Sequence, residues 1–230
     1  MSEITIASPN GGSFSAYAAG PETPSAAVVV VQEIFGVNAG IRRKCNALAQ
    51  QGYLAVAPDL FWQLEPGVEL DPDVEAEFQH ALGLMGRFDQ DAGVRDIEAT
   101  IRHIRSAMGV EKVGVVGYCL GGRLAFMAAT RTDSDASVGY YAVGIDNLLH
   151  ERHAIANPLL LHIAGEDGFV DAATQAAMHE GLDDHPKVTL YDYPGMNHGF
   201  ATESGARRND ENARLADERT AAFFAQHLAS

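Results

Sequence analysis

The sequence predicts an α/β fold in which a mostly parallel, doubly wound sheet carries helices on both faces. Two observations support this fold class. Residues 26–31 are apolar at every position, which is typical of a strand buried on both faces of a parallel sheet. Short β-branched stretches of this kind alternate along the chain with longer stretches of helical periodicity. Repeated strand-helix alternation places helices on both faces of one sheet.

Each further element is predicted from its own composition and boundaries. The helix at 89–108 carries an amphipathic stripe of apolar residues at spacings of three and four, namely Val94, Ile97, Ile101 and Ile104. The helix at 41–51 ends at Gly52, which is typical of a helix C-terminus. The other predicted helices are residues 74–86, 120–129, 172–181 and 211–229. The other predicted strands are residues 53–57, 112–117, 137–142, 158–164 and 188–193.

Length and composition indicate a single domain over residues 1–230. A chain of this length with 47% hydrophobic residues buries a sizeable core without disulfide staples. The longest apolar run, residues 26–31, is far too short to cross a membrane. The formal net charge of −15 argues against nucleic acid or an anionic membrane as a partner.

The N-terminus and the cysteines both point to a reducing compartment. The first residues lack the basic and apolar regions of a signal peptide. The chain has 2 cysteines, Cys45 and Cys119, and neither belongs to a CxxC pair. We therefore expect a cytoplasmic protein, either a monomer or a small homo-oligomer, whose partner is a small molecule.

A tight glycine-rich turn follows one of the predicted strands. It reads Gly117-Tyr118-Cys119-Leu120-Gly121-Gly122 and leads into a helix, which is the setting of a nucleophile elbow with Cys in place of Ser. Gly117 and Gly121 remove side chains that would collide in such a turn, and the helix N-terminus favours a thiolate. Cys119 is therefore the candidate nucleophile. The alternative is an inert buried cysteine, the role that we expect for Cys45.

An acid and a histidine follow later strands in the order that this chemistry requires. A cysteine nucleophile needs a base, and the base needs an orienting group. Asp167 and His198 each lie on a loop directly after a predicted strand. Because active sites of such sheets lie at the carboxyl ends of the strands, we expect both side chains beside Cys119. Glu166 is the alternative acid.

Two backbone N–H groups are candidates for stabilising an oxyanion. One belongs to Leu120, directly after the nucleophile, and the other to Ile34, on the loop after the first predicted strand. The neighbouring Glu33 follows a fully apolar strand, where a buried carboxylate must be paired or protonated. Glu33 is either a catalytic group or a loop acid that caps a helix.

Several segments together resemble the dienelactone hydrolase family. They are residues 32–38, 117–122 and 197–200, which read QEIFGVN, GYCLGG and NHGF, together with residues 58–60 and 139–141. The resemblance covers almost the whole chain and implies the α/β-hydrolase fold, with a Cys-His-Asp triad and no metal or organic cofactor. By this likeness Cys119 is the nucleophile, His198 the base and Asp167 its orienting group. Glu33 then contacts the resting thiol and helps to generate the thiolate.

The chain departs from the family at the residues that bind the substrate carboxylate. Family members that open dienelactone hold that carboxylate with two arginines, whose places are taken here by Phe78 and Thr202. Phe78, Leu82 and Met85 form an apolar helix face, which is either core packing or a pocket wall, with Phe35 as a further wall residue. Other candidates are Trp62, Tyr140 and Tyr141 for the lining, and Arg87, Arg207 and Arg208 for a positive charge.

These patterns predict a hydrolase that cleaves a small ester or lactone through a thioester on Cys119. The loss of both arginines favours a substrate other than dienelactone. Two other classes of function stay open. One is a non-catalytic ligand receptor on the same fold. The other is a redox-sensing thiol, against which the absence of a neighbouring resolving cysteine weighs.

Overall fold

The structure, a computed structural model that describes residues 2–229, is built around one 8-stranded sheet. Its strands are β1 (Ser2–Ala7), β2 (Ser13–Ala19), β3 (Ala27–Val31), β4 (Leu54–Pro58), β5 (Val113–Tyr118), β6 (Ala136–Tyr140), β7 (Leu159–Ala164) and β8 (Val188–Tyr193). They lie in the order β1-β2-β4-β3-β5-β6-β7-β8. From β4 to β8 all neighbouring pairs are parallel, whereas β2 pairs antiparallel with both β1 and β4. The predicted mostly parallel sheet is therefore confirmed.

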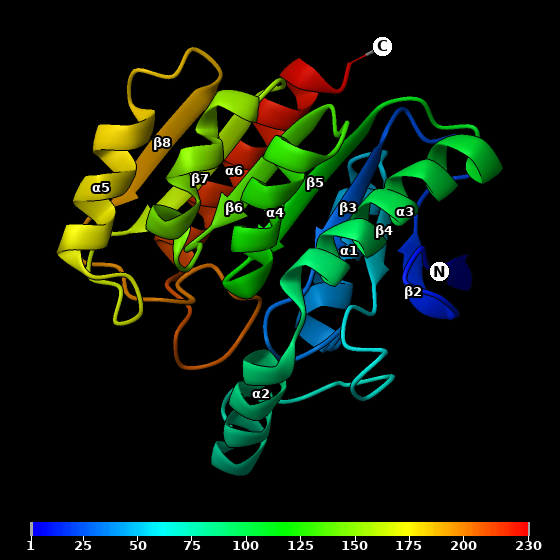
Figure 1. Cartoon of the computed structure of the whole chain (residues 1–230), viewed down its shortest axis with the longest axis horizontal. Helices are drawn as coiled ribbons and strands as arrows, with labels where there is room; N and C mark the ends of the chain where they lie inside the picture. The colour runs from blue at the N-terminus through cyan, green and yellow to red at the C-terminus, as the bar shows by residue number, and fades with distance from the viewer. Residues whose placement is uncertain (1, 230) are drawn as a thin grey trace.

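Helices cover both faces of this sheet, as predicted (Figure 1). They are α1 (Ala39–Gln50), α2 (Glu75–Arg87), α3 (Gln90–Met108), α4 (Leu120–Arg131), α5 (Ala172–Leu182) and α6 (Asp210–His227), with a 3-10 helix η1 (Ile145–Ala154). Helices α3, α4 and α5 contribute to a core on one face, and α1 and α6 contribute to a core on the other. Helix α2 stands away from the sheet at one end of the molecule (Figure 1).

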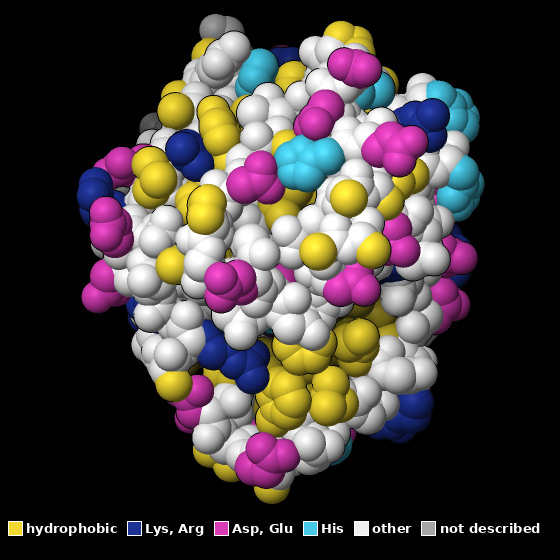
Figure 2. Space-filling model, turned by 90° about the vertical axis from the view of Figure 1, so that its left-hand side faces the viewer, with side chains coloured by type: hydrophobic (Ala, Val, Ile, Leu, Met, Phe, Trp, Pro, Cys, Tyr) yellow, Lys and Arg dark blue, Asp and Glu magenta, His cyan; other side chains and the backbone are white. Residues whose placement is uncertain are grey.

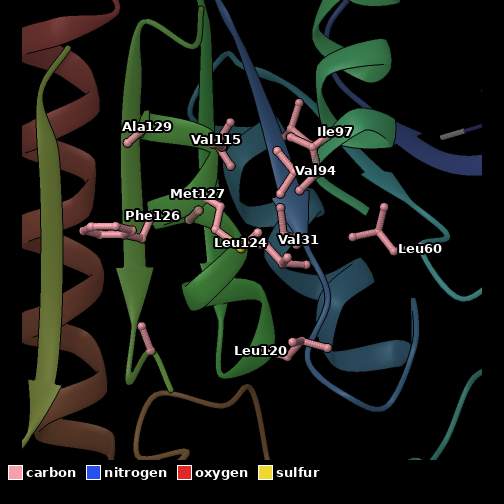
Figure 3. Close-up of a cluster of buried hydrophobic side chains, with 14 of the residues drawn as sticks. Val31, Leu60, Val94, Ile97, Val115, Leu120, Leu124, Phe126, Met127 and Ala129 are labelled. Carbon is pink, nitrogen blue, oxygen red and sulfur yellow. The ribbon is translucent and has the colours of Figure 1, made fainter. Parts of the chain in front are cut away.

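Strand β3 shows how the sheet separates the two cores. Val29 and Val31 belong to the core beside α3 and α4, whereas Val28 and Val30 belong to the core beside α1 and α6. Because side chains alternate along a strand, a strand between two cores must be apolar at every position. Figure 3 shows part of the first core, where side chains of β3 and β5 lie next to those of α3 and α4.

Strands β1 and β2 form an edge of the sheet that the apolar pattern of the sequence does not predict. In β2 the buried residues alternate with exposed ones, and most of the buried ones are alanine. This half-buried antiparallel strand carries a weaker apolar signal than β3, which is buried throughout. The strand predicted at 137–142 ends earlier, at Tyr140, because Tyr141 has a positive φ of 37° that no strand accommodates.

The parallel strands place several loops at one edge of the sheet. The loops that follow β3, β5, β7 and β8 carry Glu33, Cys119, Asp167 and His198 in turn. Since these strands run in the same direction, the loops that follow them lie at the same edge.

Candidate active site

Cys119 occupies a strained turn between β5 and α4. Its backbone has φ 55° and ψ −116°, a conformation that L-residues rarely adopt. A Cβ on Gly117 would collide with the carbonyl group of Gly121, and a Cβ on Gly121 would lie 2.5 Å from the carbonyl oxygens of Val31 and Gln32. The glycines therefore allow the turn to form and to pack against the end of β3. The partly exposed Cys119 thiol is held at the first turn of α4.

His198 and Asp167 form a buried hydrogen-bonded pair. Nδ1 of His198 lies 2.9 Å from Oδ2 and 3.1 Å from Oδ1 of Asp167, and both side chains are buried. The amide oxygen of Asn197 joins their two loops, because it accepts hydrogen bonds from the N–H groups of Gly168, at 3.0 Å, and of His198, at 2.6 Å. Glu166, the alternative acid, is exposed. The geometry thus pairs His198 with Asp167.

The electrostatic surroundings of His198 favour its charged form. Burial alone would lower the pKa of the imidazole, but the negative charges of Cys119 and Asp167, with their hydrogen bonds, raise it to about 10. His198 and Cys119 line the same cavity. An imidazolium beside a thiolate is the arrangement that activates a cysteine nucleophile.

Glu33 follows β3 and faces the same cavity as Cys119 and His198. Burial raises the pKa of its carboxyl group, while the positive charges of His198, Arg207 and Lys44 act in the opposite direction. Glu33 also lines a second and larger cavity, of about 540 Å³, together with Lys44 and the ring of Tyr141. Glu33 therefore contributes to the walls of both cavities, the one that contains Cys119 and the larger one.

Tyr141 combines a strained backbone with a buried hydroxyl group. Burial and the negative charge of Glu33 raise the pKa of this hydroxyl group. The ring packs edge-on against His198, with the centroids 5.0 Å apart. The backbone N–H donates to the carbonyl oxygen of His162 at 2.8 Å, which holds Tyr141 in its positive-φ conformation. Tyr141 thereby forms a wall behind the imidazole.

The cavity that contains Cys119 is small and mainly apolar. Its volume is about 140 Å³. Its walls are formed by Glu33, Ile34, Phe35, Phe78, Leu82, Met85, Cys119, Val143, Phe169, His198 and Arg207. Phe35 and Phe78 lie with their ring centroids 5.9 Å apart, so α2 supplies one wall through the apolar face that the sequence indicates. The structure thus brings the expected wall residues Phe35, Phe78 and Leu82 together with Cys119.

Three other expected lining residues lie elsewhere. Tyr140 is fully buried, and its hydroxyl group hydrogen-bonds to Asp217 and Thr220, so it cannot contact a substrate. The error arises because the strand ends at Tyr140, which leaves only Tyr141 at the site. Thr202 lines the larger cavity and not the one that contains Cys119. Trp62 packs against Phe14 and donates a hydrogen bond to Asp96.

Of the three arginines considered, Arg207 reaches the cavity. Its guanidinium carbon lies 5.1 Å from the centroid of the Phe78 ring. Arg87 and Arg208 donate to the carbonyl oxygens of Gly83 and Thr202 instead. The sequence alone does not separate these arginines, because a long loop between β8 and α6 carries Arg207 back over α2.

The two candidate oxyanion donors are available. Leu120 is the first residue of α4, and Ile34 follows β3, against whose end Gly121 packs. Among the residues that the structure describes, neither N–H group donates a hydrogen bond to another protein group. Both therefore remain candidates for stabilising a developing oxyanion.

Sequence reasoning alone missed Phe169, whose ring lies at the edge of the cavity, 4.8 Å from that of His198. An apolar residue two positions after the candidate acid was the available signal. Lys44 was also missed: it is buried, and its Nζ lies 3.0 Å from carboxylates of Glu203 and Asp217.

Within the described part of the chain, no cluster of three His, Cys, Asp or Glu side chains could hold a metal ion. No helix in that part has the length and apolarity needed to cross a membrane.

Comparisons with other proteins cover nearly the whole chain. The model of the dienelactone hydrolase family matches residues 14–228. A protein of Azospirillum brasilense that bears the provisional name carboxymethylenebutenolidase is 46% identical over 99% of this chain and 100% of its own. The carboxymethylenebutenolidase of Pseudomonas putida is 41% identical over 96% of this chain and 95% of its own. A crystal structure from Klebsiella pneumoniae, provisionally named a dienelactone hydrolase, matches with a TM-score of 0.82 at 26% identity, covering 98% of each chain.

Proposed function

Because the chain belongs to the dienelactone hydrolase family, we propose that Cys119, His198 and Asp167 are the catalytic triad of an ester and lactone hydrolase. The family and the α/β-hydrolase fold predicted from the sequence are confirmed. The protein is a hydrolase of small esters or lactones. The observation that carries the assignment of the triad is the buried hydrogen bond between His198 and Asp167, in a cavity that also contains the strained Cys119.

The first half of the reaction forms a thioester. The Cys119 thiolate attacks the carbonyl carbon of the substrate, and the N–H groups of Leu120 and Ile34 stabilise the oxyanion that develops. The carbon–oxygen bond of the ester then breaks, and the His198 imidazolium gives its proton to the leaving oxygen. Asp167 holds the ring in the required orientation through Nδ1.

The second half returns the free enzyme. Neutral His198 takes a proton from a water molecule, which attacks the thioester carbon. The sulfur of Cys119 leaves as a thiolate, and the acid product is released. The same imidazole thus serves as acid in the first half and as base in the second.

Glu33 is proposed to control the thiol before substrate arrives. Its carboxyl group lies in the same cavity as Cys119, and burial raises its pKa, so it is suited to exchange a proton with the thiol. Glu33→Gln should slow thioester formation without abolishing it, because His198 remains. Stopped-flow measurement of the acylation burst tests this role, and an unchanged burst would contradict it.

The walls of the cavity favour an apolar acyl group. Phe78 occupies a position that the family resemblance assigns to an arginine, and it packs with Phe35 beside Cys119. A volume of about 140 Å³ accommodates an acyl group no larger than about the size of benzene. We infer that the acyl portion of the substrate is small and uncharged.

Turnover of p-nitrophenyl acetate by the purified protein, with mass spectrometry of the intact chain during turnover, tests the proposed function. We expect a burst of p-nitrophenol and an acetyl adduct on Cys119. A non-catalytic receptor on the same fold would show neither.

We also propose a compartment and an assembly state for the protein. Both cysteines are free, and a thiol nucleophile must stay reduced, which supports the cytoplasm as the compartment. We propose a monomer or a small homo-oligomer, acting on a small molecule and not on nucleic acid. Light scattering after size-exclusion chromatography measures the assembly state.

A further inference from the structure

An open groove, distinct from both cavities described above, adjoins the apolar cavity at His198. The groove has a volume of about 450 Å³ and is lined by Gly168, Phe169, Asn197, His198, Ala206 and Arg207. The groove and the apolar cavity share Phe169, His198 and Arg207, but only the cavity contains Cys119. His198 therefore lines both spaces, the cavity that contains the nucleophile and the groove that does not.

Phe169 gives this groove an aromatic wall. The residue is 58% exposed, although large apolar side chains are normally buried. Its ring lies edge-on to His198, with the ring planes at 68°. Its backbone N–H donates to Oδ1 of Asp167 at 2.8 Å, which anchors the backbone of Phe169 to the carboxylate that pairs with His198. The exposed ring thus forms part of the wall of the groove.

Arg207 gives the groove a positive charge. Its side chain is exposed and stacks over Phe78, and within residues 2–229 it forms neither an ion pair nor a hydrogen bond with another side chain. The sequence as a whole has a net charge of −15, so the positive charge of Arg207 beside the site is opposite in sign to the net charge of the protein. Figure 2 shows hydrophobic side chains gathered low on one face of the molecule with Lys or Arg side chains beside them. An arginine of this kind binds carboxylates well.

The proposed reaction requires a leaving group beside His198. When the sulfur–carbon bond forms and the carbon–oxygen bond breaks, the proton of His198 moves to the departing oxygen. With the acyl group in the apolar cavity, the leaving group lies where the cavity and the groove meet. We propose that the groove binds the leaving group of an aryl ester, a planar phenol that bears a carboxylate. The ring would pack on Phe169 and the carboxylate would bind Arg207; this inference rests on the proposed hydrolase function.

Three acetate esters test the proposal on the intact protein: 4-acetoxybenzoate, phenyl acetate and ethyl acetate. All three form the same acetyl-Cys119 enzyme, so the groove acts only on acylation. Each kcat/KM is divided by the rate constant of hydroxide-catalysed hydrolysis of the same ester, which corrects for intrinsic reactivity. We expect the corrected kcat/KM for 4-acetoxybenzoate to exceed that for phenyl acetate by about 10-fold. The corrected kcat/KM for phenyl acetate should in turn exceed that for ethyl acetate. Equal corrected values for the three esters would overturn the proposal.

Two variants assign the effect to the groove. Phe169→Ala should lower kcat/KM for both aryl esters by a clearly larger factor than it lowers kcat/KM for ethyl acetate or the rate of deacylation. If Phe169 serves only to hold His198, all three esters and deacylation slow together, and the proposal fails. Val74→Ala, which removes another exposed large apolar side chain, is the matched control.

Arg207→Gln should remove the preference for 4-acetoxybenzoate over phenyl acetate. Arg214→Gln removes one positive charge from the surface of α6 and should leave that preference intact. If both variants reduce the preference equally, net charge explains it and the groove does not. Absence of any acetyl adduct on Cys119 would instead refute the hydrolase function itself.

Discussion

The two cysteines of this protein, Cys45 and Cys119, have the same side chain but differ in burial and in their neighbours. Cys45 lies on the inner side of α1, wholly buried, and belongs to the core between that helix and the sheet. Cys119 lies in a strained turn, partly exposed, beside His198. Burial raises the pKa of the Cys45 thiol to about 12, so this thiol stays protonated at neutral pH. Position in the fold, and not residue type, therefore distinguishes the two thiols.

His198 is the neighbour that distinguishes the surroundings of the Cys119 thiol from those of the Cys45 thiol. An apolar core opposes a thiolate because it cannot solvate the charge. Beside Cys119 stands His198, and the negative charge of Cys119 is the largest of the causes that raise the pKa of this imidazole. The contrast therefore predicts distinct responses when either cysteine or its surroundings are changed.

The largest effect is expected from removing the sulfur of Cys119. Cys119→Ala should lower kcat/KM for p-nitrophenyl acetate by about 10⁴-fold or more, because no nucleophile remains. Cys45→Ala should leave kcat/KM nearly unchanged and cost about 1 kcal/mol of unfolding free energy. Steady-state kinetics and urea unfolding measure the two effects. Substantial activity in Cys119→Ala would break the comparison.

The orienting carboxylate comes next. Asp167→Asn should lower kcat by about 10³–10⁴-fold, since an amide no longer stabilises the imidazolium or its orientation. Glu166→Gln is the matched control, because the neighbouring acid is exposed and should not affect kcat. Equal losses in both variants would show that the assignment of Asp167 is wrong.

The turn itself is expected to contribute less. Gly121→Ala places a Cβ 2.5 Å from the carbonyl oxygens of Val31 and Gln32 at the end of β3, which should cost about 1–3 kcal/mol of unfolding free energy. The accompanying displacement of Cys119 should lower kcat by about 100-fold. Gly86→Ala in α2 meets no atom within 4 Å and should stabilise the helix by about 0.5–1 kcal/mol. A fully active Gly121→Ala enzyme would argue against a constrained elbow.

The smallest effect concerns the dependence of stability on pH. The pKa of His198 is raised in the folded protein to about 10, so its contribution to stability is fully present below about 6.5, the value in an unfolded chain. It is lost as pH rises through about 10. Cys119→Ala removes the largest cause that raises this pKa, so the loss should begin at lower pH in that variant. Urea unfolding from pH 6 to about 10.5 compares it with Cys45→Ala, which should follow the wild type.

Much of the fold was predictable because its signals are local. The alternation of buried strands and amphipathic helices is present in short stretches, as in β3 and α3. The edge strands β1 and β2 were not predictable in this way. Their half-buried alternating pattern is a weak local signal, and β2 is held in the sheet by pairing with β4, which lies far away in the sequence. The helical face of Phe78 and Leu82 was visible, but whether it packed in the core or lined a cavity depended on where α2 sits.

By itself the sequence determined the turn around Cys119 and the chain order of Cys119, Asp167 and His198, because glycine spacing and strand ends are local properties. Only the tertiary structure decided which side chains converge. It joined His198 to Asp167 through their adjacent loops, buried Tyr140 behind Tyr141, and carried Arg207 over α2. Those outcomes depend on the relative placement of segments that lie far apart in the chain, which residue spacing does not encode. Cys119 and Cys45 differ for the same reason.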